Sequence, residues 1–270
     1  MAPVVWEDGW PIVSPGTGKV EWTYPQPESL CEWMPQGTIP VTTDTDFDEE
    51  KLGMEWNEIG NPRKPFYKLE NSQLKLKLLK NEIVPWDIDG LGANVFERIP
   101  AFGKSDGKAS FIGRRQQHKK FVALTALDFA PDEGECAGLT VIQNDANQIR
   151  LEYRKDSDGQ NVVSVISTKT VIRDGKQYFE EKTEGAAVVD QLFENKLYIK
   201  LAGDYTKYGY YICTDGTQWA PVAENVDGSW LGSETSGGFI GAYIGMYAYS
   251  DGEDKDKYAA FDGFVYKEVK

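Results

Sequence analysis

Short runs of alternating apolar and polar residues, separated by turn-forming residues, dominate the chain from about residue 44 to its end. Alternation with a period of two places successive side chains on opposite faces of a strand, and the runs are rich in β-branched and aromatic residues. No stretch longer than two helical turns carries an apolar stripe of helical period. The pattern predicts strands at Gln73–Leu79, Ser110–Arg115, Lys120–Asp128, Ala137–Gln143, Gln148–Lys155, Val162–Thr168, Gln177–Lys182, Lys196–Leu201, Tyr208–Thr214, Gly238–Tyr249 and Tyr258–Lys267.

Aspartate-glycine pairs mark three of the turns between these runs, at positions 158–159, 174–175 and 215–216. Glycine supplies the positive φ that a tight hairpin needs. Many short strands without intervening helices favour an all-β fold, an antiparallel two-sheet β-sandwich of the jelly-roll or lectin kind.

The first 43 residues have a different composition, with Trp6, Trp10, Trp22 and Trp33 interspersed with prolines and without either period. Proline fixes φ and lacks an N–H donor, so we expect an extended, irregular segment that packs on a neighbouring surface. The sequence therefore predicts two parts, an irregular segment at residues 1–43 and a β-sandwich at residues 44–270.

Charge argues against two classes of partner. Lysine and arginine number 29 and aspartate and glutamate 43, a net charge of −14. Such a surface repels nucleic-acid phosphates and anionic lipid headgroups, so we expect neither nucleic acid nor a membrane as a partner. The N-terminus lacks the basic start and apolar stretch of a signal peptide, and no apolar run is long enough to span a bilayer.

Cysteine and histidine are too few for the commoner metal sites. Cys31, Cys136 and Cys213 show no C-x-x-C spacing, and we expect free thiols rather than a single bridge. His118 is the single histidine, which excludes histidine-rich zinc and iron sites and favours a structural hydrogen-bonding role over a catalytic one. Any chemistry must rest on carboxylates, backbone carbonyls and aromatic rings.

A calcium site is one candidate. Asp44, Asp46 and Asp48 are spaced two apart, and Asp262 lies near the C-terminus. Calcium prefers several carboxylate and carbonyl oxygens, and the first and last strands of such sandwiches commonly pair. We predict a structural calcium bound by Asp262 and by carbonyls near Asp46. The alternative is a solvated acidic edge that blocks pairing between molecules.

Catalytic carboxylates are the second candidate. Glycosidases on lectin-like sandwiches use two acids, usually on one strand as E-x-D-x-E, and no predicted strand here has that pattern. Asp87 and Asp89 have the spacing, but they fall in a long connection, residues 81–109. We therefore predict no catalytic residues and keep a free-standing glycosidase or lyase as an alternative.

A saccharide-binding face is the third candidate. Arginine and amide groups form the planar hydrogen bonds that sugar hydroxyls accept, and aromatic rings stack on sugar faces. The candidate residues are Trp86 in the long connection, Arg114, Arg115 and Gln116 at one strand end, and Gln143 on another strand. The alternative is that the arginines form salt bridges with the abundant carboxylates.

Trp56 and Trp219 are expected to be core anchors rather than ligand platforms. Trp230, Tyr208, Tyr210 and Phe239 lie in or beside glycine-rich loops, where exposure is easier to arrange.

Several motifs in this order resemble a known family. F-I-G-R-R-Q-Q-H at residues 111–118 is followed by A-G-L-T-V-I-Q-N at 137–144, G-G-F-I-G-A-Y-I-G at 237–245 and A-x-F-D-x-F-x-Y at 259–266. Together they resemble the C-terminal concanavalin A-like domain of glycoside hydrolase family 43 β-xylosidases and arabinofuranosidases. Residues 3–11, with W-x-D-G-W-P, look like the segment that closes the catalytic propeller of those enzymes.

The resemblance implies an accessory module without the catalytic carboxylates, which in that family belong to the propeller. In that family this domain packs on the propeller and lends an aromatic residue to the active-site wall, a role that the resemblance gives to Phe239 or, alternatively, to Phe111. Related modules bind xylan.

We therefore expect a noncatalytic carbohydrate-binding module of a hemicellulase, with xylan or xylo-oligosaccharide and the covalently attached propeller as partners and an extracellular location. The alternative is a structural domain that completes the active site of the attached enzyme.

Overall fold

The computed structural model describes residues 2–21, 42–60, 62, 65–80, 82–83, 91–92, 109–237 and 241–269. The chain forms two compact units, Met1–Val41 and Thr42–Lys270, and each is described here by itself. No helix among these residues combines the length and the apolar character that crossing a bilayer requires.

The first unit contains a β-hairpin. Strands β1 (Val4–Glu7) and β2 (Trp10–Val13) are antiparallel, and Asp8 and Gly9 form the turn with φ values of 50° and 82°. The expectation of an irregular segment was wrong for these residues, because two positive φ values in an Asp-Gly turn are what a tight hairpin requires. Every strand residue is exposed, Trp6 and Trp10 by 71% and 73%.

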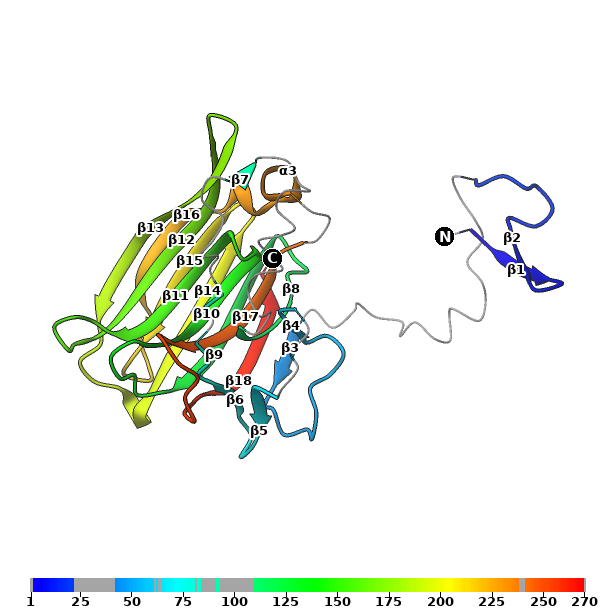
Figure 1. Ribbon diagram of the computed structural model, residues 1–270. Coiled ribbons are helices and arrows are strands. Elements are labelled where there is room, and N and C mark those ends of the chain that lie inside the picture. Colours follow the sequence, from blue (N-terminus) through cyan, green and yellow to red (C-terminus); the bar gives the residue numbers. More distant parts are fainter. Residues whose placement is uncertain are drawn as a thin grey trace. The chain divides into compact units, whose positions relative to one another are not determined.

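The second unit is built from two sheets whose paired strands are all antiparallel (Figure 1). The first sheet has the order β4 (Asn57–Glu58), β8 (Ser110–Arg115), β17 (Tyr243–Ser250), β10 (Glu135–Asn144), β11 (Asn147–Lys155), β12 (Asn161–Arg173), β13 (Lys176–Val188) and β7 (Leu91–Gly92). The second has the order β16 (Ala220–Asp227), β15 (Lys207–Cys213), β14 (Lys196–Asp204), β9 (Lys120–Asp128), β18 (Tyr258–Glu268), β6 (Leu74–Lys77) and β5 (Tyr67–Leu69), with β3 (Thr42–Thr45) paired to β18.

The helical elements among the described residues are short: η1 (Phe193–Asn195), η2 (Ser229–Leu231) and α3 (Ser233–Ser236). The all-β, antiparallel two-sheet sandwich is therefore confirmed. The predicted Asp-Gly turns are also present, with φ near 79°, 72° and 76° at Gly159, Gly175 and Gly216.

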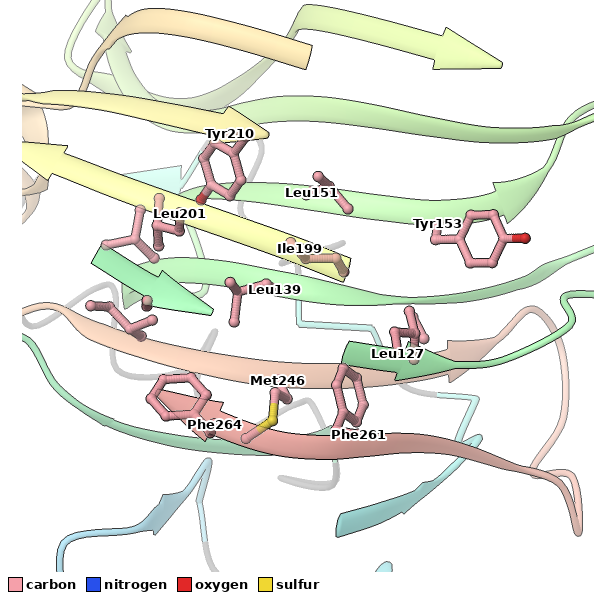
Figure 2. Close-up of a cluster of buried hydrophobic side chains, with 14 of the residues drawn as sticks. Leu127, Leu139, Leu151, Tyr153, Ile199, Leu201, Tyr210, Met246, Phe261 and Phe264 are labelled. Atoms are coloured by element: carbon pink, nitrogen blue, oxygen red, sulfur yellow. The ribbon is translucent and has the colours of Figure 1, made fainter. Parts of the chain in front are cut away.

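The inner faces of the two sheets form one apolar core (Figure 2). Leu139, Leu151 and Met246 project from the first sheet toward Ile199 and Phe261 of the second. All five are fully buried, and burial of each such side chain contributes about 1.5–3 kcal/mol.

The anchor role expected for Trp56 is confirmed. Its side chain is 8% exposed, and its ring meets that of Phe264 edge-on at 5.1 Å. The expectation for Trp219 was wrong, because that side chain is 38% exposed. Cys136 and Cys213 are buried free thiols, as expected, and Cys31 lies outside the described residues.

A second, smaller apolar cluster covers the outer face of the first sheet. It joins Ile83 to Phe111, Cys136, Ile142 and Tyr247. Beside it, the Nε2 group of Gln148 donates to the Ile83 carbonyl oxygen at 2.7 Å. The chain that follows β6 therefore returns across this face.

Glu135, at the start of β10, is a buried carboxylate that pairs with two partly exposed lysines. Its side chain is 1% exposed and accepts hydrogen bonds from the Nζ atoms of Lys255 at 3.0 Å and Lys257 at 2.5 Å and from the Asp132 N–H at 2.8 Å. Burial alone would raise the pKa of this carboxyl, but these donors lower it below the ordinary 4.5.

We predict that this group makes unfolding depend on pH in acid. The folded state binds the Glu135 proton more weakly than the unfolded chain, so the stabilisation is complete above the unfolded pKa and is lost as pH falls through the lower folded pKa. Glu135→Gln should lower the free energy of unfolding at pH 7 by roughly 1–3 kcal/mol. The same substitution should make the free energy of unfolding fall less steeply as the pH drops below 4.5, which urea unfolding at several pH values measures.

Glu133→Gln, at an exposed neighbouring position, is the control and should change neither quantity. Equal pH profiles for wild type and Glu135→Gln would contradict this account of the ion pairs.

Candidate functional site

Two of the motifs meet at one end of the sandwich. Strand β8 ends at Arg115, which lies opposite Tyr243 at the start of β17. The Gln116 N–H then donates to the Ala242 carbonyl oxygen at 2.9 Å. Residues 111–118 and 241–245, more than a hundred positions apart in the sequence, therefore lie side by side at this end of the first sheet.

Arg114 projects from β8 to the inner side of the sheet. Its guanidinium lies 5.9 Å from the Trp56 ring and 5.5 Å from the Tyr266 ring, and the side chain is 5% exposed. Its Nε and Nη1 atoms have no hydrogen-bond partner. Burial lowers the pKa of this guanidinium below its ordinary value, although the charge of Glu55 opposes the shift. The two aromatic rings are therefore its main support.

Arg115 projects to the opposite face. Its side chain is exposed, and its guanidinium lies 4.9 Å from the Tyr243 ring. In the part of the chain that the structure describes, neither Arg114 nor Arg115 forms an ion pair, so the salt-bridge alternative does not hold there. Arg150, by contrast, does form ion pairs. Its Nε lies 2.7 Å from Glu152 Oε1, and its Nη2 lies 2.8 Å from Glu181 Oε1.

The turn that follows Arg115 is fixed by two tyrosines. The Tyr266 hydroxyl accepts hydrogen bonds from the N–H groups of Gln117 and His118, both at 3.0 Å. The Tyr208 hydroxyl donates to Gln116 Oε1 at 3.1 Å, and Gln116 Nε2 donates to the His118 carbonyl oxygen. Burial raises the pKa of both tyrosines, which keeps the hydroxyls protonated at neutral pH. His118 takes part as a hydrogen-bonding residue of this turn.

An open cleft of about 620 Å³ lies beside this turn. Its walls are residues 116–119, the β14–β15 turn with Tyr205 and Thr206, Tyr208, residues 228–229 and 231–234, and the pair Gly241 and Ala242. Tyr205 presents the most exposed aromatic ring of the cleft, at 59%, with the Nζ atoms of Lys119 and Lys120 each 5.8 Å from its centroid.

Gln143 supports one wall of the cleft from behind. Its side chain is 2% exposed, and its Nε2 donates to the Gly237 carbonyl oxygen at 2.8 Å. Asn144 Nδ2 donates in the same way to Ser236, at 3.3 Å. These bonds hold the end of α3, where Gly237 takes a φ of 76°. Gln143 thus positions the wall, and its amide is turned away from solvent.

Two of the expected binding residues, Trp86 and Phe239, lie outside the described residues, as do Asp87 and Asp89. Gly237 and Gly241, the described residues nearest to Phe239 in the chain, are both held near the cleft, by Gln143 and through the neighbouring Ala242. Phe111, the alternative for the wall role, is 2% exposed. A side-chain carbon at Gly113 or Gly245 would lie 2.4 Å from the Phe111 ring, so that ring is packed down on the sheet.

The structure therefore brings Arg115 and Gln116 to the end of the sandwich that carries the cleft and places Arg114 and Gln143 behind it. Sequence reasoning missed Tyr205. The available signal was an aromatic residue in the tight D-Y-T-K turn between two strands, where a ring has no room to turn inward.

The acidic edge shows a partial fit to calcium. Strand β3 pairs with β18 as expected, with Asp44 opposite Val265 and Thr45 opposite Phe264. However, Asp262 Oδ2 already accepts a hydrogen bond from Lys196 Nζ, and Asp46 Oδ1 accepts one from the Asp48 N–H at 3.4 Å. The described residues contain no group of three or more acidic, histidine or cysteine side chains placed to hold a metal.

Residues 44–267 match the family described as the β-xylosidase C-terminal concanavalin A-like domain. A xylosidase/arabinosidase of Butyrivibrio fibrisolvens is 29% identical over 273 residues, covering 100% of this chain and 46% of the relative. A non-reducing-end α-L-arabinofuranosidase of Bacteroides ovatus is 29% identical over 270 residues, covering 99% of this chain and 44% of the relative. The chain thus spans about half the length of these curated relatives.

Solved structures agree with this assignment. A family 43 protein of the Bacteroides ovatus xyloglucan locus superposes with a TM-score of 0.68 at 27% identity, over 99% of this chain and 46% of that one. A xylan β-1,4-xylosidase of Bacillus halodurans gives the same TM-score and coverage at 23% identity, which shows the fold alone. The resemblance carried by the sequence motifs is confirmed, and the chain belongs to the family of β-xylosidase C-terminal concanavalin A-like domains of glycoside hydrolase family 43.

Proposed function

We propose that this domain is a noncatalytic, carbohydrate-binding accessory module of an extracellular hemicellulase and that it binds xylan or xylo-oligosaccharide at the cleft. The observation that carries the proposal is the composition of this end of the sandwich. An exposed ring, Tyr205, stands in the cleft wall, and Arg115, exposed and without an ion-pair partner in the described chain, lies on the edge where residues 116 and 242 line it.

The chemistry of the wall suits a neutral sugar. Sugars are recognised by an aromatic ring against the face of the pyranose and by planar or hydroxyl hydrogen bonds at its rim. Tyr205 supplies the ring, and Gln117, Ser229 and Glu234 supply donors and acceptors around it. The turn is fixed by Tyr208 and Tyr266 before any ligand arrives, which reduces the entropy lost on binding.

A second candidate function is completion of the active site of an attached catalytic domain. The observation that favours it is the anchoring of the chain on both sides of Phe239, by Gln143 at Gly237 and by Gln116 at Ala242. The relatives are about twice as long as this chain and include xylosidases and an arabinofuranosidase, which supports an attached glycosidase as the covalent partner.

We predict that Tyr205→Ala and Arg115→Ala each weaken the retardation of the protein in xylan-containing gels. Loss of one hydrogen bond or stacking contact corresponds to about 0.5–1.5 kcal/mol, or roughly twofold to tenfold in affinity. Affinity electrophoresis in xylan, arabinoxylan and cellulose measures this, and Trp86→Ala belongs in the same series.

Arg173→Ala is the matched control, because Arg173 is an exposed arginine in the β12–β13 hairpin, where it pairs with Glu180. If xylan retards the wild type and retards Tyr205→Ala and Arg115→Ala equally strongly, the cleft is not the binding site. If xylan does not retard the folded wild type, the binding proposal is contradicted, and completion of the active site of an attached catalytic domain is the function that stays.

The Gln143→Ala variant distinguishes structural support of the cleft wall from direct contact with the ligand. Loss of a buried amide that holds Gly237 should lower the free energy of unfolding by about 1–3 kcal/mol, measured by urea unfolding. Any loss of xylan retardation should then accompany a lower melting temperature, whereas Arg115→Ala should leave the melting temperature nearly unchanged. A Gln143→Ala protein of normal stability and weak binding would instead make Gln143 a direct ligand contact.

We also propose that calcium binds at the edge formed by β3 and β18, through Asp262 and the carbonyls near Asp46, in place of the Lys196 ammonium. Calcium should then raise the melting temperature, since an ion that binds the folded state stabilises it. Asp262→Ala should abolish that rise, and Lys196→Met should enlarge it by removing the competing cation. If neither calcium nor EDTA changes the melting curve, the calcium proposal is contradicted. The role of Asp262 is then its ion pair with Lys196.

A further inference from the structure

The outer face of the second sheet carries an aromatic group that the cleft does not include. Tyr211 of β15 and Trp219, just before β16, both lie close to Lys200 of β14. The Lys200 Nζ atom is 4.3 Å from the Tyr211 ring centroid and 4.7 Å from that of Trp219. Trp219 is 38% exposed and Tyr211 is half-buried, so the described part of this face presents aromatic surface beside a lysine.

The register extends this group across the sheet. Val265 of β18 lies opposite Leu124 of β9, which lies opposite Lys200, and Lys200 lies opposite Tyr211. Val265, Leu124 and Tyr211 are all half-buried on this outer face. With strands about 4.8 Å apart, the row from Val265 to Tyr211 is about 14 Å long, enough for a short oligosaccharide.

Local structure fixes the Tyr211 ring and the turn that leads to Trp219. Tyr211 lies over Gly209, where a side-chain carbon would be 3.0 Å from the ring, and its hydroxyl donates to Glu224 Oε1 at 2.8 Å. The turn before Trp219 is fixed by Asp215, whose Oδ1 accepts from the N–H groups of Thr217 and Gln218, each at 2.8 Å. A surface whose supporting backbone is fixed loses less entropy when a ligand binds to it.

We propose that Trp219, Tyr211 and Lys200 form a second saccharide-binding site, which takes a short stretch of an extended, uncharged polysaccharide of the xylan or cellulose type. The Trp219 ring offers exposed apolar surface, Lys200 is a hydrogen-bond donor beside it, and Glu224 is an acceptor at the rim, which is the combination that pyranose faces and hydroxyls need. The net charge of −14 and the carboxylate of Glu224 disfavour an anionic ligand.

This inference rests on the proposed polysaccharide-binding function but names a different surface. Trp219→Ala should reduce retention in xylan or cellulose gels by roughly threefold to tenfold, the loss of one aromatic contact. Lys200→Met should reduce it as well. The melting temperature of both should stay within a degree or two of the wild type, because the site lies on the surface.

Trp10→Ala is the matched control, an exposed tryptophan outside the sandwich that should leave retention unchanged. Weaker retention in Trp219→Ala with normal retention in Tyr205→Ala supports the platform and overturns the cleft as the binding site. The reverse result overturns the platform and keeps the cleft. Weakening in both variants supports two sites, and a wild type that neither polysaccharide retards overturns both.

Discussion

The pairing of the C-terminal strand with strands from the first half of the chain is the interaction on which this sandwich depends. Strand β18 is paired along its length with β9, and its other edge is shared by β6 and β3. It also contributes Phe261 and Phe264 to the core, both fully buried. The second sheet is therefore incomplete until the last residues of the domain are in place. Contacts of such long sequence separation predict slow folding.

The same strand supports the cleft. Tyr266 belongs to β18, yet its hydroxyl fixes the turn at Gln117 and His118, and its ring lies beside the Arg114 guanidinium. One residue therefore couples the closure of the second sheet to the shape of the edge where Arg115 and Gln116 lie. The charge of Arg114 is tolerated there because the rings of Trp56 and Tyr266 lie within cation–π distance of it.

The longer strands could be predicted from the sequence because their alternation is regular and both faces have defined environments. Lys120–Asp128 was predicted with its exact bounds, whereas β12 and β13 run several residues further than expected. Short strands such as β4 and β7 hold two residues each, too few to show a period. The hairpin at Val4–Val13 was not predicted, because the many prolines and tryptophans of this segment disrupt the alternation and the Asp-Gly turn at residues 8–9 was not recognised.

The site was harder to predict because which face a side chain occupies depends on register. Arg114 and Arg115 are neighbours in sequence but project to opposite faces of β8, so one is buried and the other exposed. Gln143 has the right chemistry for a ligand contact, but its partner Gly237 lies far along the chain, and only the fold brings them together. Trp219 was expected to be a core anchor because it follows the Asp-Gly turn at residues 215–216, but its side chain is exposed.

The position of the C-terminal residues affects how this domain can be handled. The Val269 N–H donates to the Lys120 carbonyl oxygen at 3.1 Å, and the preceding residue, Lys119, lines the cleft. Anything joined after Val269, such as an affinity tag, a fluorophore or a surface linker, would therefore begin beside the cleft. Immobilisation through that end would shield the cleft, whereas attachment at the β5–β6 turn, where Asn71 and Ser72 have positive φ, would join a different part of the second sheet.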